Sequence, residues 1–127
     1  MAEDNQQELL FKLSMFEQQI RQLQEQINAV ENGILELESL GFGLEELKNS
    51  EGKEIMAPVG RGIFLKSKIA SGDLVVDIGQ KNFVKKSVPE TQKMIGEQVE
   101  RLKNVRQELE LGLEEMGREV QKMIGEK

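Results

Sequence analysis

The chain has 127 residues with a formal net charge of −6, and 31% of its residues are charged while only 4% are aromatic. It contains five Phe and neither Trp nor Tyr, so the large rigid side chains that usually anchor a globular core are scarce. This composition excludes a thick aromatic interior and is typical of long, solvated helices.

Several kinds of chemistry are excluded by the residue types that are missing. There is no His and no Cys, which removes imidazole bases, thiolate nucleophiles, the usual zinc ligands and disulfides. The sequence also lacks the G-x-x-x-x-G-K-[ST] loop that cradles nucleotide phosphates. We therefore predict a protein that is not an enzyme, with no catalytic residues, no metal site and no cofactor.

Compartment and partners are constrained by charge and hydropathy. No stretch approaches the roughly 20 apolar residues that a membrane span needs, and the acidic, polar residues 1–7 are unlike a signal or transit peptide. The lack of Cys fits a reducing compartment. The negative charge would repel a phosphate backbone. We expect a cytoplasmic protein without membrane or nucleic-acid partners.

Apolar residues near the start of the chain follow a heptad repeat with spacings that alternate between 4 and 3. The positions of this first seam are Leu9, Leu13, Phe16, Ile20, Leu23, Ile27, Val30, Ile34 and Leu37. Leu44 keeps the same phase beyond Gly41, and no proline precedes Pro58. The pattern predicts one continuous helix over about residues 6–48, roughly 65 Å long at 1.5 Å per residue.

The last third of the chain repeats the pattern. The positions of this second seam are Ile95, Val99, Leu102, Arg106, Leu109, Leu113, Met116, Val120 and Met123. Arg106 can fix the register of the helix pair or lay its aliphatic stem on the seam and extend its charge into solvent, and we favour the second arrangement. Ser87 is a candidate N-cap, and Pro89 is tolerated in a first helical turn. A helix over 88–126 would match the first in length, so an antiparallel pair within the chain satisfies both seams. A parallel homodimer would need the central segment to loop out of the way.

Between the two helices the apolar period changes to that of strands. We predict four strands over about 54–59, 62–70, 73–78 and 82–86, which form two hairpins within 53–86. Turn residues separate them, as in Gly60-Arg61-Gly62 and Gly79-Gln80-Lys81-Asn82. Two such hairpins cannot bury a core alone, so we expect them to join equivalent strands of other subunits in a closed β structure. The residues assigned to this oligomerisation are Ile55, Val59, Ile63, Leu65, Ile69, Leu74, Val76, Ile78 and Phe83.

The order of these segments resembles the α class of the prefoldin family over nearly the whole chain. Pro58, Gly60 and Gly62 in the first hairpin, and Gly79 after Val76-Asp77-Ile78, occupy places that match the family's hairpin motifs. Two hairpins indicate the α rather than the β class. Arg61 stands where the family often has a small residue, and Gln80-Lys81 follow Gly79 where another Gly is common, differences that concern turn geometry and not architecture.

This resemblance implies a fold that is mostly α with a small β part. A long antiparallel two-helix coiled coil would carry two central β-hairpins that join an oligomeric β-barrel platform, all in a single domain of residues 1–127. The resemblance also implies a hexamer with β-type prefoldin subunits, two α and four β. It further implies an ATP-independent chaperone that holds unfolded client proteins and delivers them to a group II chaperonin.

Apolar residues beyond those of the seam gather where the first helix begins and the second ends. Leu10, Phe11 and Met15 lie off the seam, and Ile124 lies beside Met123. Exposed apolar surface usually marks an interaction site, and Met and Leu can repack around different partners. The predicted client-binding tip comprises Leu9, Leu10, Phe11, Leu13, Met15, Phe16, Met116, Val120, Met123 and Ile124. Gly112, Gly117 and Gly125 should loosen this part of the second helix.

Two other interpretations stay open at this point. The extra apolar residues can simply extend a packed helix end or become exposed by fraying. At the level of the whole protein, the alternative function is a structural, filament-forming coiled coil whose hairpins assemble but whose tip binds nothing in particular. Seam residues farther from the tip, such as Ile20 and Leu109, are assigned to coiled-coil packing.

Overall fold

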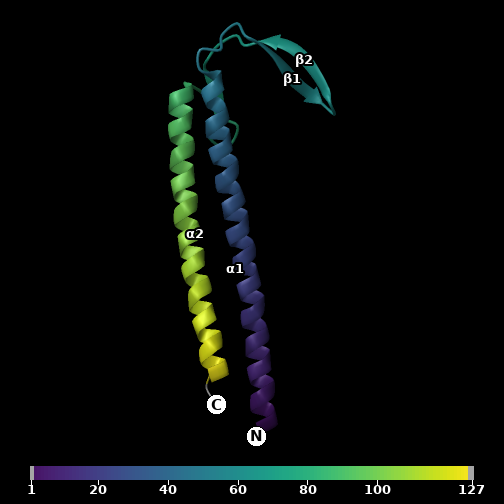
Figure 1. Ribbon diagram of the computed structural model, residues 1–127, viewed down its shortest axis with the longest axis vertical. Helices are drawn as coiled ribbons and strands as arrows, with labels where there is room; N and C mark the ends of the chain where they lie inside the picture. Colours follow the sequence, from purple (N-terminus) through teal and green to yellow (C-terminus); the bar gives the residue numbers. More distant parts are fainter. Residues whose placement is uncertain (1, 126–127) are drawn as a thin grey trace. The chain divides into compact units, whose positions relative to one another are not determined.

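A computed structural model of the chain describes residues 2–125, and its helices and strands are labelled in Figure 1. The elements are, in order, α1 (Ala2–Leu44), a 3-10 turn η1 (Glu45–Leu47), β1 (Glu54–Gly60), β2 (Ile63–Lys68), β3 (Leu74–Asp77), β4 (Phe83–Lys86) and α2 (Val88–Gly125). Two long helices with two small hairpins between them confirm the predicted fold class.

The chain divides into two compact units, which are described separately. The first contains the described residues up to Leu35 and those from Glu100 onward, and the second contains Glu36–Val99. The single domain over 1–127 stays a prediction. Its terminal residues 1, 126 and 127, and the predicted helix end at 126, lie outside the described residues.

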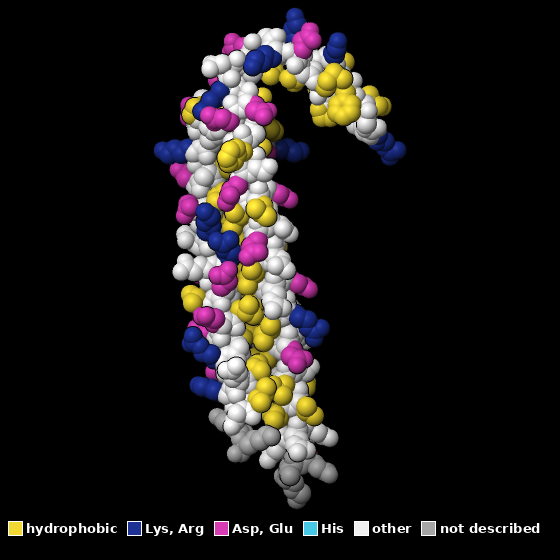
Figure 2. Space-filling view, viewed as in Figure 1, with side chains coloured by type: hydrophobic (Ala, Val, Ile, Leu, Met, Phe, Trp, Pro, Cys, Tyr) yellow, Lys and Arg dark blue, Asp and Glu magenta, His cyan; other side chains and the backbone are white. Residues whose placement is uncertain are grey.

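In the first unit, α1 and α2 pack together in antiparallel order. A Cβ atom on Gly33 would lie 3.4 Å from Leu102 Cδ1, and one on Gly112 would lie 4.0 Å from Leu23 Cδ1. Positions later in α1 thus meet positions earlier in α2. Ile34 is only 4% exposed, and Figure 2 shows hydrophobic side chains gathered where the two helices meet. The heptad seam is the buried stripe of this pair, as its period predicts.

The bounds of α1 differ from the predicted 6–48 at both ends. The helix begins at Ala2 because the polar residues that follow are compatible with a helix, so it need not wait for the first seam residue. It ends at Leu44, and the chain tightens into η1, where the Lys48 amide donates to the Glu45 carbonyl at 3.3 Å. Asn49 then adopts a left-handed φ of 57°, which stops the helix.

The end of α1 in the second unit is capped by a side chain from α2. Gln92 Nε2 donates to the Gly41 carbonyl at 3.1 Å and to Glu45 Oε2 at 2.6 Å. Lys48 Nζ also donates to Glu45 Oε1, at 2.9 Å. The hydrogen bond from Gln92, followed by that from Lys48, lowers the pKa of Glu45. The carbonyls at a helix C-terminus lack partners within the helix, and Gln92 satisfies one of them.

The start of α2 has the cap that its sequence predicts. Ser87 Oγ accepts a hydrogen bond from the Glu90 amide at 3.2 Å, and Pro89 lies in the first turn. The buried hydroxyl of Thr91 donates to the Ser87 carbonyl at 2.9 Å. Ser50, between η1 and β1, is also buried, and its hydroxyl donates to the Leu47 carbonyl. Both polar side chains are therefore accommodated in the interior by local bonds.

The two hairpins are separate two-stranded antiparallel sheets. In β1–β2, Gly60 pairs with Ile63 after a bulge, which leaves Arg61-Gly62 as a two-residue turn with φ values of 48° and 79°. In β3–β4, Gln80 and Lys81 have φ values of 51° and 63°. Positive φ at both central residues is the geometry that fits the twist of a hairpin. Arg61, Gln80 and Lys81, which depart from the residues common in the resembled family, thus adopt the left-handed conformation that glycine favours.

Candidate functional site

The first hairpin exposes apolar side chains on both of its faces. The register places Ile55 and Leu65 on one face and Met56, Pro58 and Phe64 on the other, and all five are exposed. Leu65 and Ile63 remain 61% and 63% exposed. A two-stranded sheet with apolar residues on both faces is unstable in water alone, so another surface must cover it.

The second hairpin has two unlike faces. Leu74, Val76 and Val84 form a half-buried face, whereas Val75 and Phe83 are exposed on the opposite face. Of the residues predicted for oligomerisation, six are exposed and three are half-buried. The exposed ones are Ile55, Val59, Ile63, Leu65, Ile78 and Phe83, and the half-buried ones are Ile69, Leu74 and Val76.

Three exposed apolar residues of the hairpins were missed by the sequence reasoning. Met56, Phe64 and Val75 are adjacent to predicted residues in their strands, so they lie on the opposite face from Ile55, Leu65 and Val76. The signal that could have found them is the apolar character of both alternating sets, which indicates a strand covered on two sides. Each strand also has only one partner among the described residues, which leaves an open edge for strand addition.

The tip of the helix pair lies in the first unit, where α1 begins and α2 ends (Figure 1). Leu10 and Phe11 are each 66% exposed, and Met15 and Ile124 are also exposed. Leu9 is marginally exposed. The other predicted tip residues are half-buried on the seam, and these are Leu13, Phe16, Met116, Val120 and Met123.

A groove brings predicted tip residues of both helices together. It has a volume of about 440 Å³ and is lined by Met15 and Phe16 from α1 and Met123 from α2. Lys12, Gln19 and Glu119 complete its lining. Three of its six residues are therefore flexible or aromatic apolar side chains, which suits contact with a varied apolar partner.

Glycines in α2 reduce the stability of the helix near this tip, and replacing them by Ala should increase it. No atom lies within 4 Å of a Cβ built on Gly117, and one built on Gly112 meets only Leu23 at 4.0 Å. We expect Gly112→Ala and Gly117→Ala each to raise the free energy of unfolding by about 1 kcal/mol, from helix propensity alone. Thermal denaturation followed by circular dichroism measures this. A decrease in stability would mean that the helices approach more closely there than the structure shows.

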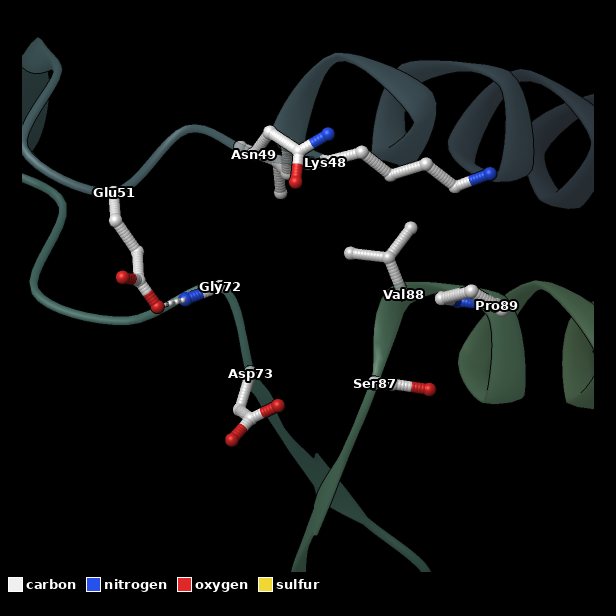
Figure 3. Close-up of a pocket in the computed structure, with 9 residues that line it drawn as sticks. Lys48, Asn49, Glu51, Gly72, Asp73, Ser87, Val88 and Pro89 are labelled. Atoms are coloured by element: carbon white, nitrogen blue, oxygen red, sulfur yellow. Dashed lines mark hydrogen bonds between the residues drawn. The ribbon is translucent and has the colours of Figure 1, made fainter.

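A hollow of about 590 Å³ lies in the second unit, between the turn after η1, the linker that joins the hairpins and the start of α2 (Figure 3). Three of its polar side chains take part in local hydrogen bonds or ion pairs. Glu51 accepts a hydrogen bond from the Gly72 amide at 3.2 Å, Ser87 caps α2, and Lys48 pairs with Glu45. These bonds stabilise the turn after η1, the linker between the hairpins and the start of α2, which surround the hollow.

Other exposed apolar side chains lie on the helices. Phe42, on α1 in the second unit, is 84% exposed, and Leu40 is also exposed. The sequence reasoning did not single them out because they fall between seam positions. Over residues 2–125, no helix is long and apolar enough to cross a membrane. The same residues contain no cluster of three or more acidic side chains arranged to hold a metal ion.

Comparison with known proteins points to one family. Residues 16–126 match the family model described as prefoldin subunit. Prefoldin subunit alpha from Methanobrevibacter smithii is 33% identical over 92 residues, which cover 72% of this chain and 63% of the relative. Prefoldin subunit alpha 1 from Thermococcus kodakarensis is 34% identical over 95 residues, which cover 72% of this chain and 65% of the relative. The match thus spans slightly less than two thirds of these relatives.

A solved structure shares the fold. The cryo-EM structure of filamentous PFD from Methanocaldococcus jannaschii matches with a TM-score of 0.81 and 26% sequence identity, over 90% of this chain and 96% of that one. The predicted resemblance to the α class is confirmed by the relatives. Because the family model covers most of the sequence, the chain belongs to the prefoldin family.

Proposed function

We propose that the chain is a subunit of an ATP-independent molecular chaperone that holds non-native polypeptides at the helical tip. The observation that carries this proposal is the set of apolar side chains at the tip that the seam leaves exposed, namely Leu10, Phe11, Met15 and Ile124. Their burial against an exposed apolar segment of a client would prevent that segment from aggregating. The function needs no catalytic residue and no cofactor.

The hairpins support the assembly that such a chaperone needs. Both faces of β1–β2 and one face of β3–β4 expose apolar residues, so covering them by other subunits would stabilise an oligomer. We propose that the partners are β-type prefoldin subunits, in a hexamer of two α and four β subunits whose hairpins form a β-barrel platform. Several tips acting on one client would raise avidity without a tight individual site.

Delivery of the client completes the proposed cycle. The subunit would act in the cytoplasm and transfer its clients to a group II chaperonin. The names of the curated relatives support membership of a prefoldin assembly. A tip built from flexible Leu and Met side chains supports transfer, because such contacts repack easily when a second binding surface competes for the client.

A filament of this chain is the second candidate function. It is favoured by the similarity to the filamentous PFD from Methanocaldococcus jannaschii, which covers nearly all of both chains. In that case the hairpins would join copies of this same chain into a scaffold, and the tip would bind no client. Size analysis of the chain, alone and mixed with a β-type subunit, separates the two assemblies, since a filament of the chain alone grows with concentration while a closed hexamer forms only with the partner and keeps one size.

The chaperone proposal is tested by suppression of the aggregation of a chemically unfolded protein. The chain is co-assembled with a β-type subunit and compared with a variant that carries Leu10→Ser, Phe11→Ser, Met15→Ser and Ile124→Ser. We expect at least a tenfold larger amount of the variant to be needed, because tenfold corresponds to about 1.4 kcal/mol, less than one fully buried apolar side chain contributes.

A matched control removes exposed apolar residues of the same unit away from the tip. Leu35→Ser and Val105→Ser should protect the client as well as wild type does, since both side chains are exposed on the helices but lie more than ten residues along the sequence from either tip segment. Equal protection by wild type and the tip variant would place clients elsewhere on the assembly. If no assembly protects, the scaffold function replaces the chaperone one.

A further inference from the structure

We propose that the tip selects apolar client segments that carry Lys or Arg beside the apolar residues. This inference rests on the proposed function and deepens it, because it names the class of client. The apolar side chains would provide affinity for any exposed hydrophobic segment, while a set of carboxylates around them would favour basic segments over acidic ones.

Two adjoining hollows at the tip supply the geometry. The groove between the helices contains Met15, Met123 and Glu119, and a second hollow of about 700 Å³ is lined by Asp4, Gln7, Glu8, Phe11 and Lys12. Lys12 lines both of them, so the two hollows meet at this residue. Along α1, Asp4, Glu8, Phe11 and Met15 follow one another at spacings of 4, 3 and 4, which places acidic and apolar side chains on one helical face.

The charge of this surface is negative. The lining of the two hollows contains three carboxylates, those of Asp4, Glu8 and Glu119, and one ammonium group, that of Lys12. All four side chains are exposed. Within residues 2–125 none of the three carboxylates forms an ion pair, and Arg118, beside Glu119 in sequence, is directed to Glu114 at 3.8 Å instead. A cationic group on a client therefore complements the surface, and an anionic group is repelled.

The preference for basic segments should be modest because the carboxylates are exposed to solvent. An ion pair between exposed groups changes an equilibrium constant by less than tenfold, and salt screens it. Several such pairs around an apolar contact act mainly on the choice of partner and on the association rate. The tip should thus bind many apolar segments and still rank them by charge.

The test uses two fluorescent peptides with the same apolar core, one flanked by Lys and the other by Glu. Their binding to the co-assembled full chain is measured by fluorescence anisotropy at low and at high salt. We expect the Lys-flanked peptide to bind about three- to tenfold more tightly at low salt, and we expect the difference to shrink as salt is added.

Two variants locate the charges that are responsible. Asp4→Asn, Glu8→Gln and Glu119→Gln together should remove the preference and leave the shared apolar affinity. Glu25→Gln, Glu31→Gln and Glu108→Gln remove the same number of charges from exposed positions of the same unit away from the tip, and they should keep the preference. Circular dichroism shows whether each variant keeps its helices.

The outcomes separate this inference from the proposed function. If wild type binds both peptides equally, the charge selection is wrong and client binding at the tip stands. If the control variant also loses the preference, the selection arises from the net charge of the chain, and the assignment to the tip is wrong. If neither peptide binds, the proposed client-binding function fails and the selection fails with it.

Discussion

Replacing Ile34 by Asp should unfold the helix pair of the first unit. Ile34 is 4% exposed on the seam, so the variant loses the burial of a large apolar side chain and places an uncompensated carboxylate in its position. We expect a loss of about 3–5 kcal/mol in the free energy of unfolding. Because domains are stable by only about 5–15 kcal/mol, the helical circular dichroism signal should melt at a much lower temperature.

The adjacent residue provides the control. Leu35 is 64% exposed on the same helix, so Leu35→Asp puts the same carboxylate in solvent and should change stability by about 0.5 kcal/mol or less. Equal destabilisation by the two variants would contradict the assignment of Ile34 to the buried seam. It would mean that the register of α1 against α2 differs from the one described.

Replacing Ile63 and Leu65 by Ser should abolish assembly while the chain keeps its helices. Both residues are more than half exposed within the chain, so their loss barely affects its own packing. Each would contribute about 1.5–3 kcal/mol if another subunit fully buried it. Losing both corresponds to a weakening of about a hundredfold or more in each contact. Light scattering coupled to size-exclusion chromatography measures the mass of the assembly that the variant forms with a β-type subunit.

The control variant for assembly carries two substitutions on the same strand, β2. Lys66→Ser and Lys68→Ser alter exposed side chains of β2 without removing apolar area, and this variant should assemble to the mass of wild type. Full assembly of the Ile63→Ser, Leu65→Ser variant would show that the covered surface is the opposite face of the hairpin, where Met56 and Phe64 lie.

Much of the fold was predictable because its determinants are local or periodic. The heptad spacing of Ile27 and Ile34 identifies the buried stripe of α1, since a seven-residue repeat returns to the same helical face. Ser87 was recognised as an N-cap from its type and its place before an apolar period. The hairpins followed from alternating apolar residues bounded by glycine turns.

Other features of the structure depend on contacts between residues far apart in the sequence, which local sequence patterns do not predict. The hydrogen bond from Gln92 to the Gly41 carbonyl joins residues 51 positions apart, and an ordinary surface Gln in a helix has the same local sequence. The strong exposure of Phe42 likewise depends on what α2 leaves uncovered. At the tip, the sequence indicates the apolar residues, but the neighbouring carboxylates join the site only through the two hollows that meet at Lys12.

Side-chain burial in the first unit is uneven along the helix pair. Ile27 and Ile34 are buried, whereas no residue over 4–23 or 100–125 is. Local opening needs the least free energy where few side chains are buried, so the tip end should open and reclose many times while the helices around Ile34 stay paired. A client held at the proposed tip would then bind an ensemble of conformations, and ordering that ensemble would oppose binding. Under the proposed function, thermal fluctuation of the tip would release the client without nucleotide hydrolysis.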